Sequence, residues 1–305
     1  MLEVFQRIID AASADVPVLV TGETGTGKDL VAGAIHNRSR RKDKPFVAVN
    51  MGAMPAELIA SELFGHEKGA YTGAIAAHKG SFELAAGGTI FLDEISTMDE
   101  KCQVFLLRVL ETKTFRRVGG ERDIRVDVRV IGATNENLEA AIKKNRFRED
   151  LYYRFDVFRI NLPPLRDRPG GLRVLSQYFL AQFRQMHKKN LRSVSAEALR
   201  CLESYSWPGN VRELKNVIQR AVLVAEDEVL TPDLLPARIR NAGESDRESL
   251  WASFPIHIGM TLEAVEKEFI AMTLASAAGN KKKAASILGI SRRTLYDKLK
   301  RHGLL

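Results

Sequence analysis

A glycine-rich loop between an apolar strand and a helix constrains this chain more than any other feature. The apolar run Val16 to Thr21 precedes the loop, and a helical pattern begins after it at Asp29. Glycines let consecutive backbone N–H groups turn toward phosphate oxygens, while the helix N-terminus and Lys28 add positive potential. This order predicts a phosphate-binding loop, although a glycine-rich turn without nucleotide is the alternative for the loop alone. The predicted nucleotide-binding residues are Gly22, Glu23, Thr24, Gly25, Thr26, Gly27 and Lys28.

A second apolar strand, Thr89 to Asp93, ends in the adjacent acids Asp93 and Glu94. We expect Asp93 to hold Mg²⁺ through water and Glu94 to polarise the attacking water, because phosphoryl transfer depends on positioning and charge stabilisation. Two acids after a strand are often only a helix N-cap and first turn, but the loop upstream favours a nucleoside triphosphatase. The residues ahead of the acids are also predicted to bind nucleotide: Ala85, Ala86, Gly87, Gly88 and Thr89.

The residue after Lys28 departs from the general phosphate-loop pattern. Asp29 stands where Ser or Thr normally binds Mg²⁺. That departure either weakens direct metal ligation or replaces it by a carboxylate contact. ATP and Mg²⁺ are therefore the predicted cofactors, with the metal held by Asp93 and, in the second case, also by Asp29. The cysteines and histidines show no metal-ligand spacing, so no further metal site is predicted.

Strand-like runs alternate with helical patterns through the first two thirds of the chain, which predicts a parallel α/β sheet. The runs are Val16 to Thr21, Phe46 to Asn50, Thr89 to Asp93 and Val126 to Thr134. From about Gly170 the strands stop, and helices are predicted over Leu172 to His187, Ser195 to Ser204 and Asn210 to Ala225. These helices are expected to form a lid on the nucleotide-binding part.

The division into domains follows from composition. We predict an α/β ATPase part over 1–168, a helical lid over 169–237, a linker over 238–258 and a helical DNA-binding domain over 259–305. The stretch between about Glu226 and Gly259 contains Pro, Glu and Ser and has no sustained period, which is typical of a linker. The longest apolar runs are strand-sized, whereas a membrane helix needs about 20 residues. Met1 to Ser13 is a poor signal peptide, so a cytoplasmic protein without a membrane partner is expected.

Positive charge is concentrated at the C-terminal end. Eight Lys and Arg side chains and a single acid, Asp297, lie between Asn280 and His302. Helices predicted over Asn280 to Leu288 and Ser291 to Arg301 share an apolar face. This pattern favours a helix-turn-helix that binds double-stranded DNA, while a basic helical bundle without a DNA role is the alternative. The predicted DNA-binding residues are Lys281, Lys282, Lys283, Ser291, Arg292, Arg293, Thr294, Tyr296 and Lys300.

Over essentially its whole length the chain resembles the AAA+ activators of sigma-54 RNA polymerase, which end in a Fis-type DNA-binding domain. These proteins usually carry Glu after the loop Lys, so Asp29 is a mild variation. The most specific motif follows the run Glu62 to Lys68, and in this family it tips a mobile loop that contacts sigma-54. Its residues here are Gly69, Ala70, Tyr71, Thr72, Gly73 and Ala74. The family usually has Phe where this chain has Tyr71, and Tyr keeps the aromatic ring.

The resemblance also implies roles for isolated polar residues. Asn50 matches the residue that hydrogen-bonds the catalytic Glu, and Asn135 matches the polar sensor near the γ-phosphate. Arg148 and Arg154 match paired arginines that reach a neighbour's ATP, which implies a ring, with a hexamer favoured. Arg212 matches the second sensor, which contacts phosphate within its own subunit. Two motif-level expectations accompany these: Asn210 caps the lid helix, and a helix over Thr261 to Ala277 supplies a dimer contact.

The resemblance therefore predicts that ATP hydrolysis in a ring moves the Tyr71 loop against sigma-54 and opens the promoter. Binding upstream DNA would raise the local activator concentration. The alternative is a DNA-binding regulator that retains the ATPase fold without contacting sigma-54, against which the Gly69 to Ala74 motif argues. A helicase or repair motor is disfavoured because no helicase-type motifs accompany the loop.

Overall fold

The computed structural model describes the chain except for residues 72, 242–259, 278–279 and 304–305. It divides into two compact units, Met1–Arg240 and Asn241–Leu305. The predicted linker over 238–258 spans this division, and 242–258 lies outside the described residues together with Gly259 and Thr72. In the described part of the chain, no helix has the length and apolar character needed to cross a membrane.

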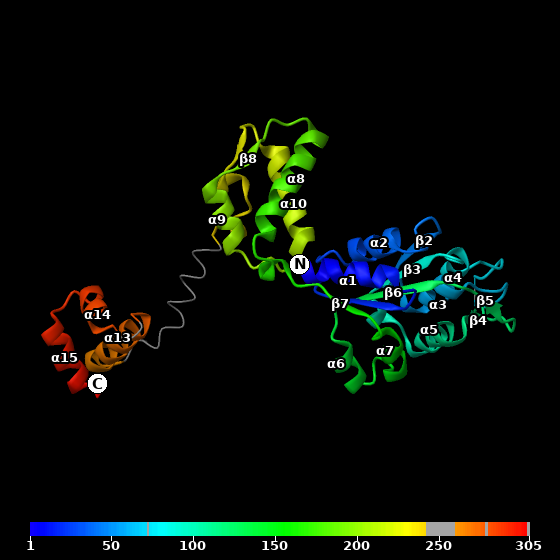
Figure 1. The fold of residues 1–305 in the computed structure, drawn as a ribbon, viewed down its shortest axis with the longest axis horizontal. Coiled ribbons are helices and arrows are strands. Elements are labelled where there is room, and N and C mark those ends of the chain that lie inside the picture. Colours follow the sequence, from blue (N-terminus) through cyan, green and yellow to red (C-terminus); the bar gives the residue numbers. More distant parts are fainter. Residues whose placement is uncertain (72, 242–259, 278–279, 304–305) are drawn as a thin grey trace. The chain divides into compact units, whose positions relative to one another are not determined.

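The first unit is built on a five-stranded parallel sheet (Figure 1). In spatial order the strands are β2 (Phe46–Asn50), β3 (Thr89–Asp93), β6 (Arg129–Thr134), β1 (Val18–Thr21) and β7 (Arg159–Asn161). The predicted parallel α/β fold is confirmed, with three corrections. β1 begins at Val18 rather than Val16, β6 begins at Arg129 rather than Val126, and the edge strand β7 was not predicted. In β7 only Ile160 is buried, so its sequence shows no apolar run.

Helices cover both faces of the sheet, which explains why β1 is buried throughout. Leu19 packs with Ile90 and Leu92 in one core, whereas Val18 and Val20 pack with Phe91 in the other. The first core is covered by α3 (Ala56–Phe64), α5 (Glu100–Thr112) and α7 (Glu149–Phe155), and the second by α1 (Leu2–Ser13) and α2 (Lys28–Arg38). The remaining elements of this part are η1 (Met51–Ala53), α4 (Ser81–Leu84), η2 (Ile95–Thr97), α6 (Leu138–Lys143) and the antiparallel hairpin β4 (Thr114–Phe115) and β5 (Ile124–Arg125).

The lid follows β7 and has its own core around the buried Trp207, whose Nε1 donates to the carbonyl of Leu202 at 2.8 Å. Its helices are α8 (Gly171–His187), α9 (Ala196–Ser204), α10 (Asn210–Val224) and α11 (Ala237–Arg240), with the short turns η3 (Leu165–Asp167) and η4 (Pro232–Leu234). The prediction that strands stop near Gly170 is wrong, because β8 (Ser193–Val194) pairs with β9 (Val229–Leu230). Two-residue strands are too short to show a period.

The second unit contains α13 (Leu262–Ser276), α14 (Lys281–Ile287) and α15 (Arg292–Arg301). The predicted shared apolar face is confirmed, and α13 completes it. The buried residues of this core are Ile270, Ala277, Ala284, Ala285, Leu295 and Leu299, with Leu288 and Ile290 packed against them. Most of the basic residues of α14 and α15 are exposed on this bundle.

Candidate functional site

The phosphate-binding loop lies where β1 ends and α2 begins. Gly25 and Gly27 adopt left-handed backbone conformations, with φ of 79° and 97°, which glycine reaches without steric cost. A Cβ atom at Gly25 would also overlap the carbonyl oxygen of Gly209. Lys28 opens α2 and is buried, and its Nζ donates to the carbonyls of Gly22 at 2.9 Å and Glu23 at 3.2 Å. The loop therefore curls around the Lys28 ammonium group.

Asp93 lies at the carboxyl end of β3 in the same cleft as Lys28. Burial raises the pKa of Asp93, an effect that the positive charge of Lys28 opposes. Burial lowers the pKa of Lys28, which the negative charges of Asp93 and Glu94 oppose. Because opposite charges favour each other's ionised form, each group offsets part of the effect of burial on the other.

Glu94 has a left-handed backbone, with φ of 61°. It occupies the N-cap position of η2, but its side chain makes no capping hydrogen bond, which argues against a purely capping role. Its carboxylate lies against Gly52, where a Cβ atom would overlap Oε2. The Oδ1 of Asn50 accepts from the amide of Gly52 at 3.0 Å. Asn50 and Glu94 are thus brought together at Gly52, while among the described contacts no hydrogen bond joins their side chains.

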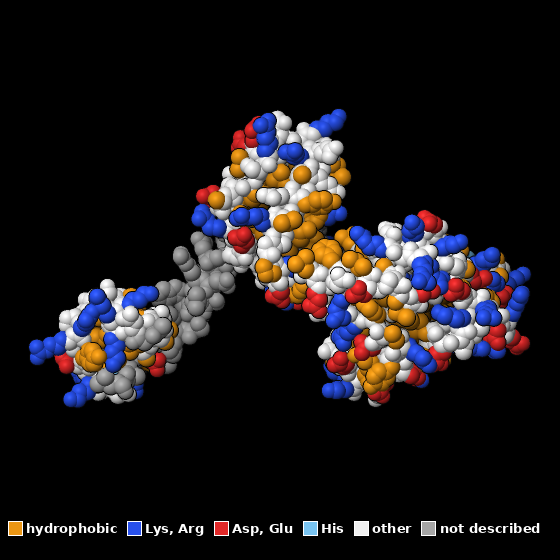
Figure 2. All heavy atoms as spheres, viewed as in Figure 1, with side chains coloured by type: hydrophobic (Ala, Val, Ile, Leu, Met, Phe, Trp, Pro, Cys, Tyr) orange, Lys and Arg blue, Asp and Glu red, His pale blue; other side chains and the backbone are white. Residues whose placement is uncertain are grey.

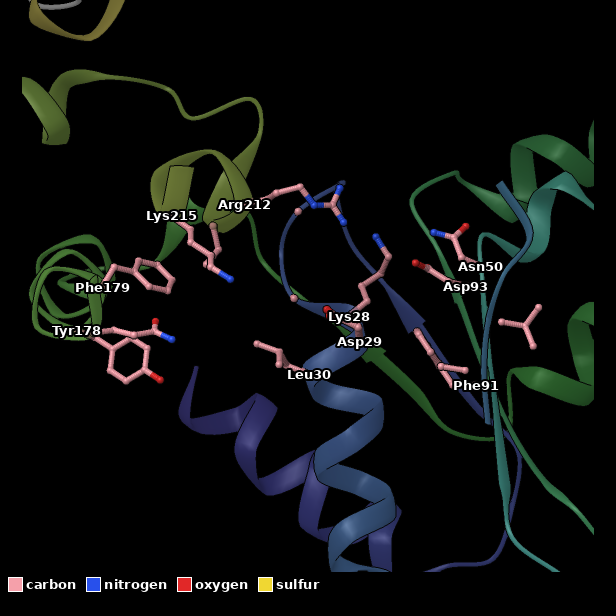
Figure 3. A pocket seen from close by; sticks show the side chains of 16 residues that line it. Lys28, Asp29, Leu30, Asn50, Phe91, Asp93, Tyr178, Phe179, Arg212 and Lys215 are labelled. Atoms are coloured by element: carbon pink, nitrogen blue, oxygen red, sulfur yellow. The ribbon is translucent and has the colours of Figure 1, made fainter. Parts of the chain in front are cut away.

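Asn135 and Arg212 approach the loop from other elements. At the end of β6, the Nδ2 of Asn135 donates to Oγ1 of Thr24 at 2.9 Å. Arg212 lies in the first turn of α10 and extends toward the loop on the side opposite Asp93 and Asn50 (Figure 3). Lys28 stands between these groups. The cleft has a volume of about 550 Å³ and is also lined by Asp29, Leu30, Tyr178, Phe179, Gln182 and Lys215.

The structure corrects the prediction that five residues ahead of the acids bind nucleotide: Ala85, Ala86, Gly87, Gly88 and Thr89. These residues lie at or before the beginning of β3, and none of them lines the cleft that holds Lys28. The amide of Gly87 donates to the carbonyl of Asp127 at 2.7 Å, and Thr89 meets Nδ1 of His36 at 3.0 Å. In a parallel sheet the carboxyl ends of strands share one edge, so the start of β3 lies at the edge away from the loop.

The structure also corrects the prediction that Asn210 caps the lid helix. The N-cap of α10 is Gly209, and Asn210 is the first helical residue, fully buried with φ of 50°. Its Nδ2 donates to Oε2 of Glu23 and to the carbonyl of Thr24, each at 3.1 Å, and its Oδ1 accepts from the amide of Leu165 at 2.7 Å. The side chain therefore connects the loop with the start of the lid. Sequence reasoning missed this role because the motif places Asn beside Pro-Gly, where a cap is common.

Arg148 and Arg154 lie on either end of α7, and neither lines the Lys28 cleft. The guanidinium of Arg148 binds both carboxylate oxygens of Asp150, at 3.1 and 2.7 Å. Arg154 donates to Glu111 at 3.0 and 2.7 Å. Both arginines are thus held at the surface of their own subunit, apart from its phosphate-binding loop.

Backbone hydrogen bonds join the two ends of the motif from Gly69 to Ala74. The amide of Gly69 donates to the carbonyl of Ala74 at 2.9 Å, and that of Ala74 to the carbonyl of Tyr71 at 3.0 Å. Tyr71 is 40% exposed, and its ring packs edge-on against His66, with 5.1 Å between ring centroids. The turn therefore presents an aromatic ring to the outside. Thr72 lies outside the described residues.

In the second unit, Ser291 caps α15 by accepting from the amide of Thr294 at 3.1 Å, as predicted. The Nζ of Lys281 lies 4.7 Å from the centre of the Tyr296 ring, within cation–π range. Arg301 pairs with Glu263 at 3.3 Å. Other predicted DNA-binding side chains are exposed, and no ion pair engages them in the described part of this unit: Lys282, Lys283, Arg292, Arg293 and Lys300. Figure 2 shows Lys and Arg side chains on the visible face of the unit.

Comparison with known proteins covers nearly the whole chain. Residues 1–161 match the family described as the sigma-54 interaction domain, 166–251 the AAA+ ATPase lid domain, and 261–302 the Fis family of bacterial regulatory proteins. The chain is 44% identical over 304 residues to the nitrogen fixation protein AnfA of Azotobacter vinelandii, covering 100% of this chain and 56% of that protein. It is 42% identical over 323 residues to the DNA-binding transcriptional regulator NtrC of Proteus hauseri, covering 100% of this chain and 68% of that protein.

Among solved structures, NtrX from Brucella abortus in complex with ATP superposes with a TM-score of 0.72 and 35% sequence identity. The match covers 99% of this chain and 67% of the NtrX chain. The chain spans little more than half the length of AnfA, at 56%.

Proposed function

The chain belongs to the sigma-54 interaction domain family of AAA+ proteins, and we propose that it is an ATP-dependent transcription activator. It binds DNA through its C-terminal unit and uses ATP hydrolysis in a ring to convert sigma-54 RNA polymerase from the closed to the open promoter complex. The observation that carries the proposal is the convergence of Lys28, Asp93 and Arg212 on one cleft of a chain whose matched domains include both a sigma-54 interaction domain and a Fis-type domain.

In this proposal the cleft binds ATP. The amides of the glycine-rich loop and the Lys28 ammonium hold the phosphates, and Asn135 and Arg212 lie around the same loop. Glu94 lies against Gly52, whose amide donates to Asn50, and we assign its carboxylate to positioning and polarising the attacking water. Binding of ATP brings phosphate charge to Lys28, which favours the protonated lysine despite its burial.

The residues of the cleft also fit Mg²⁺. Asp93 accepts one hydrogen bond from the amide of Glu94 at 3.1 Å, which leaves its other carboxylate oxygen for a cation. Asp29 lines the same cleft, and carboxylates with phosphate oxygens are the ligands that Mg²⁺ prefers. We therefore assign the metal to Asp93, with Asp29 as a further oxygen ligand. The ion would supply neutralisation of the phosphate charge.

Hydrolysis on this account needs a second subunit. Arg148 and Arg154 lie at the two ends of α7 and do not line their own cleft. This supports the proposal that they serve a neighbour in a ring, for which we favour a hexamer. An arginine supplied from a neighbouring subunit contributes about 10³ to 10⁵ to turnover. Assembly and catalysis are then coupled, because a lone subunit lacks part of its active site.

The exposed ring of Tyr71 is the proposed contact with sigma-54. A single aromatic side chain between small residues gives a contact that forms and breaks as the loop moves. The C-terminal unit binds double-stranded DNA, with α15 reading bases and the lysines of α14 binding phosphates. Both contacts belong to a protein that acts in the cytoplasm.

The experiment that tests this function compares transcription from a sigma-54 promoter and from a promoter read by another sigma factor. The chain and ATP should raise transcript from the first promoter alone, and a non-hydrolysable ATP analogue should not replace ATP. A change that is independent of ATP hydrolysis, or that appears equally at both promoters, would favour the alternative of a DNA-binding regulator that does not contact sigma-54.

A further inference from the structure

The carboxylate of Glu23 is directed to the lid rather than to the phosphate-binding cleft. It accepts from both terminal nitrogens of Arg166, at 2.9 and 2.5 Å, and from Nδ2 of Asn210 at 3.1 Å. Arg166 lies in η3, where the chain enters the lid, and Asn210 opens α10. These hydrogen bonds lower the pKa of Glu23 to about 2, with that from Arg166 the largest cause. Glu23 is therefore ionised throughout the physiological pH range.

The backbone of the same loop also binds the lid. The carbonyl of Gly25 accepts from the amides of Val211 at 3.0 Å and Arg212 at 3.2 Å. These amides belong to the first turn of α10, whose orphan donors need acceptors. The loop that surrounds Lys28 thus supplies the acceptor for the start of the helix that carries Arg212. Arg168 adds a further link by donating to the carbonyl of Thr26 at 3.0 Å.

Asn210 is the buried centre of these contacts. It is fully buried with a left-handed backbone, a conformation that a non-glycine residue adopts only when its surroundings impose it. Its amide group joins Glu23, Thr24 and Leu165. A shift of the phosphate-binding loop would therefore change hydrogen bonds of a buried side chain, which is costlier than changing those of an exposed one.

We propose that Glu23, Asn210 and Arg166 form a latch that couples the phosphate-binding loop to the lid and sets the position of Arg212. Glu23 is then a positioning residue rather than a phosphate ligand. This inference rests on the proposed ATP hydrolysis for its kinetic consequences, but the contact itself can be measured without turnover.

The exposed Glu23–Arg166 pair taken alone would contribute little, because surface ion pairs are screened by water. The effect depends on the shared hydrogen bond to the buried Asn210. A graded series separates the two. Glu23→Gln keeps an acceptor for Asn210 and loses the charge opposite Arg166, whereas Glu23→Ala loses both. Asn210→Gly removes the amide group and still accepts the left-handed backbone.

The first readout is hydrogen exchange at the amides of Val211 and Arg212, measured on the full chain with and without ADP. Glu23→Ala and Asn210→Gly should speed exchange at these amides by about tenfold, the effect of about 1.4 kcal/mol on local opening. Exchange in the lid core around Trp207 should stay unchanged, which separates a lost latch from unfolding. Glu228→Gln is the matched control, since it breaks another ion pair of the lid, with Arg192 at 3.2 Å.

The second readout is ATP turnover. Glu23→Ala should lower kcat by about tenfold with ADP affinity within about threefold of wild type, and should have no further effect in an Arg212→Ala background, because both changes remove the same positioned group. The kcat of Glu23→Gln should lie between those of the wild type and Glu23→Ala. Unchanged amide exchange in Glu23→Ala, or additive losses of kcat with Arg212→Ala, would overturn the latch. A wild-type chain that binds ADP and hydrolyses no ATP would instead refute the proposed function, and the exchange result would still decide the latch.

Discussion

Lys28 and Asp93 share one cleft, and burial acts on their pKa values in opposite directions: it lowers that of Lys28 and raises that of Asp93. Each charge opposes the effect of burial on the other, although burial remains the larger effect on both pKa values. A cleft arranged in this way attracts a ligand that carries both negative charge and a cation. Magnesium nucleotide has that combination.

Replacement of Lys28 tests the phosphate-binding role. Lys28→Met removes a charged donor worth about 1.5 to 3 kcal/mol, so ATP should bind roughly tenfold to 150-fold more weakly. Without the lysine the pKa of Asp93 should rise further, and Mg²⁺-dependent binding should require a higher pH. Titration of a fluorescent, non-hydrolysable ATP analogue between pH 6 and pH 9 measures both effects. Equal affinity in the variant would exclude Lys28 from the nucleotide site.

Replacement of Glu94 separates binding from hydrolysis. Glu94→Gln keeps the size of the side chain against Gly52 and removes the base, so ATP should bind normally while kcat falls by about 10² to 10⁴. The measurement is steady-state phosphate release beside equilibrium nucleotide binding. Glu57→Gln, an exposed glutamate on α3, is the control that should leave both unchanged. Turnover at the wild-type rate in Glu94→Gln would remove Glu94 from the chemistry.

Mixed rings test whether the arginines of α7 act on a neighbour. Arg154→Ala should lower turnover by about 10³ or more, and so should Glu94→Gln by itself. Mixing the two inactive variants places an intact Glu94 beside an intact Arg154 at some interfaces, which should restore part of the turnover. Arg200→Ala, which breaks an exposed ion pair in the lid, should not need rescue. Absence of any recovery in rings shown to be mixed would contradict action between subunits.

Replacing different basic residues of the second unit should affect DNA binding in different ways, because some contact bases and others contact phosphates. Arg292→Ala should reduce discrimination between DNA sequences by about 1 to 3 kcal/mol, whereas Lys281→Ala should mainly lower the salt dependence of binding. Arg301 is paired with Glu263, so Arg301→Ala should change both quantities less. Salt-titrated binding to a specific and a random duplex measures them. Identical effects of the Arg292 and Lys281 changes would refute the assignment of α15 to base contacts.

The sequence predicted the features that have strong local signals. The glycine-rich loop, the strand ending in Asp93 and the Ser291 cap follow from residue type at fixed spacing, and the structure places them as expected. The strand β7 and the β8–β9 pair were missed because two or three residues cannot show a period. Local sequence does not reveal which partner a polar side chain meets. Asn210 was therefore expected to cap a helix, although its amide joins the loop to the lid.

The contacts at Ala85 to Thr89 were misplaced for a related reason. A motif read along the chain treats the whole strand as one site, whereas in a parallel sheet only the carboxyl end of β3 meets the loop after β1. Which end of β3 lies beside the loop depends on how the strands pair in the sheet.

Open-complex formation tests the central claim most directly. Core RNA polymerase, sigma-54 and a sigma-54 promoter are combined with this chain and ATP, and melted promoter DNA is measured beside ATP turnover. The wild type and Tyr71→Phe, which keeps the ring that packs on His66, should open the promoter, while Tyr71→Ala should hydrolyse ATP and leave it closed. If the wild type hydrolyses ATP and the promoter stays closed, or if Tyr71→Ala opens it as well as the wild type does, remodelling of sigma-54 polymerase through this loop is contradicted.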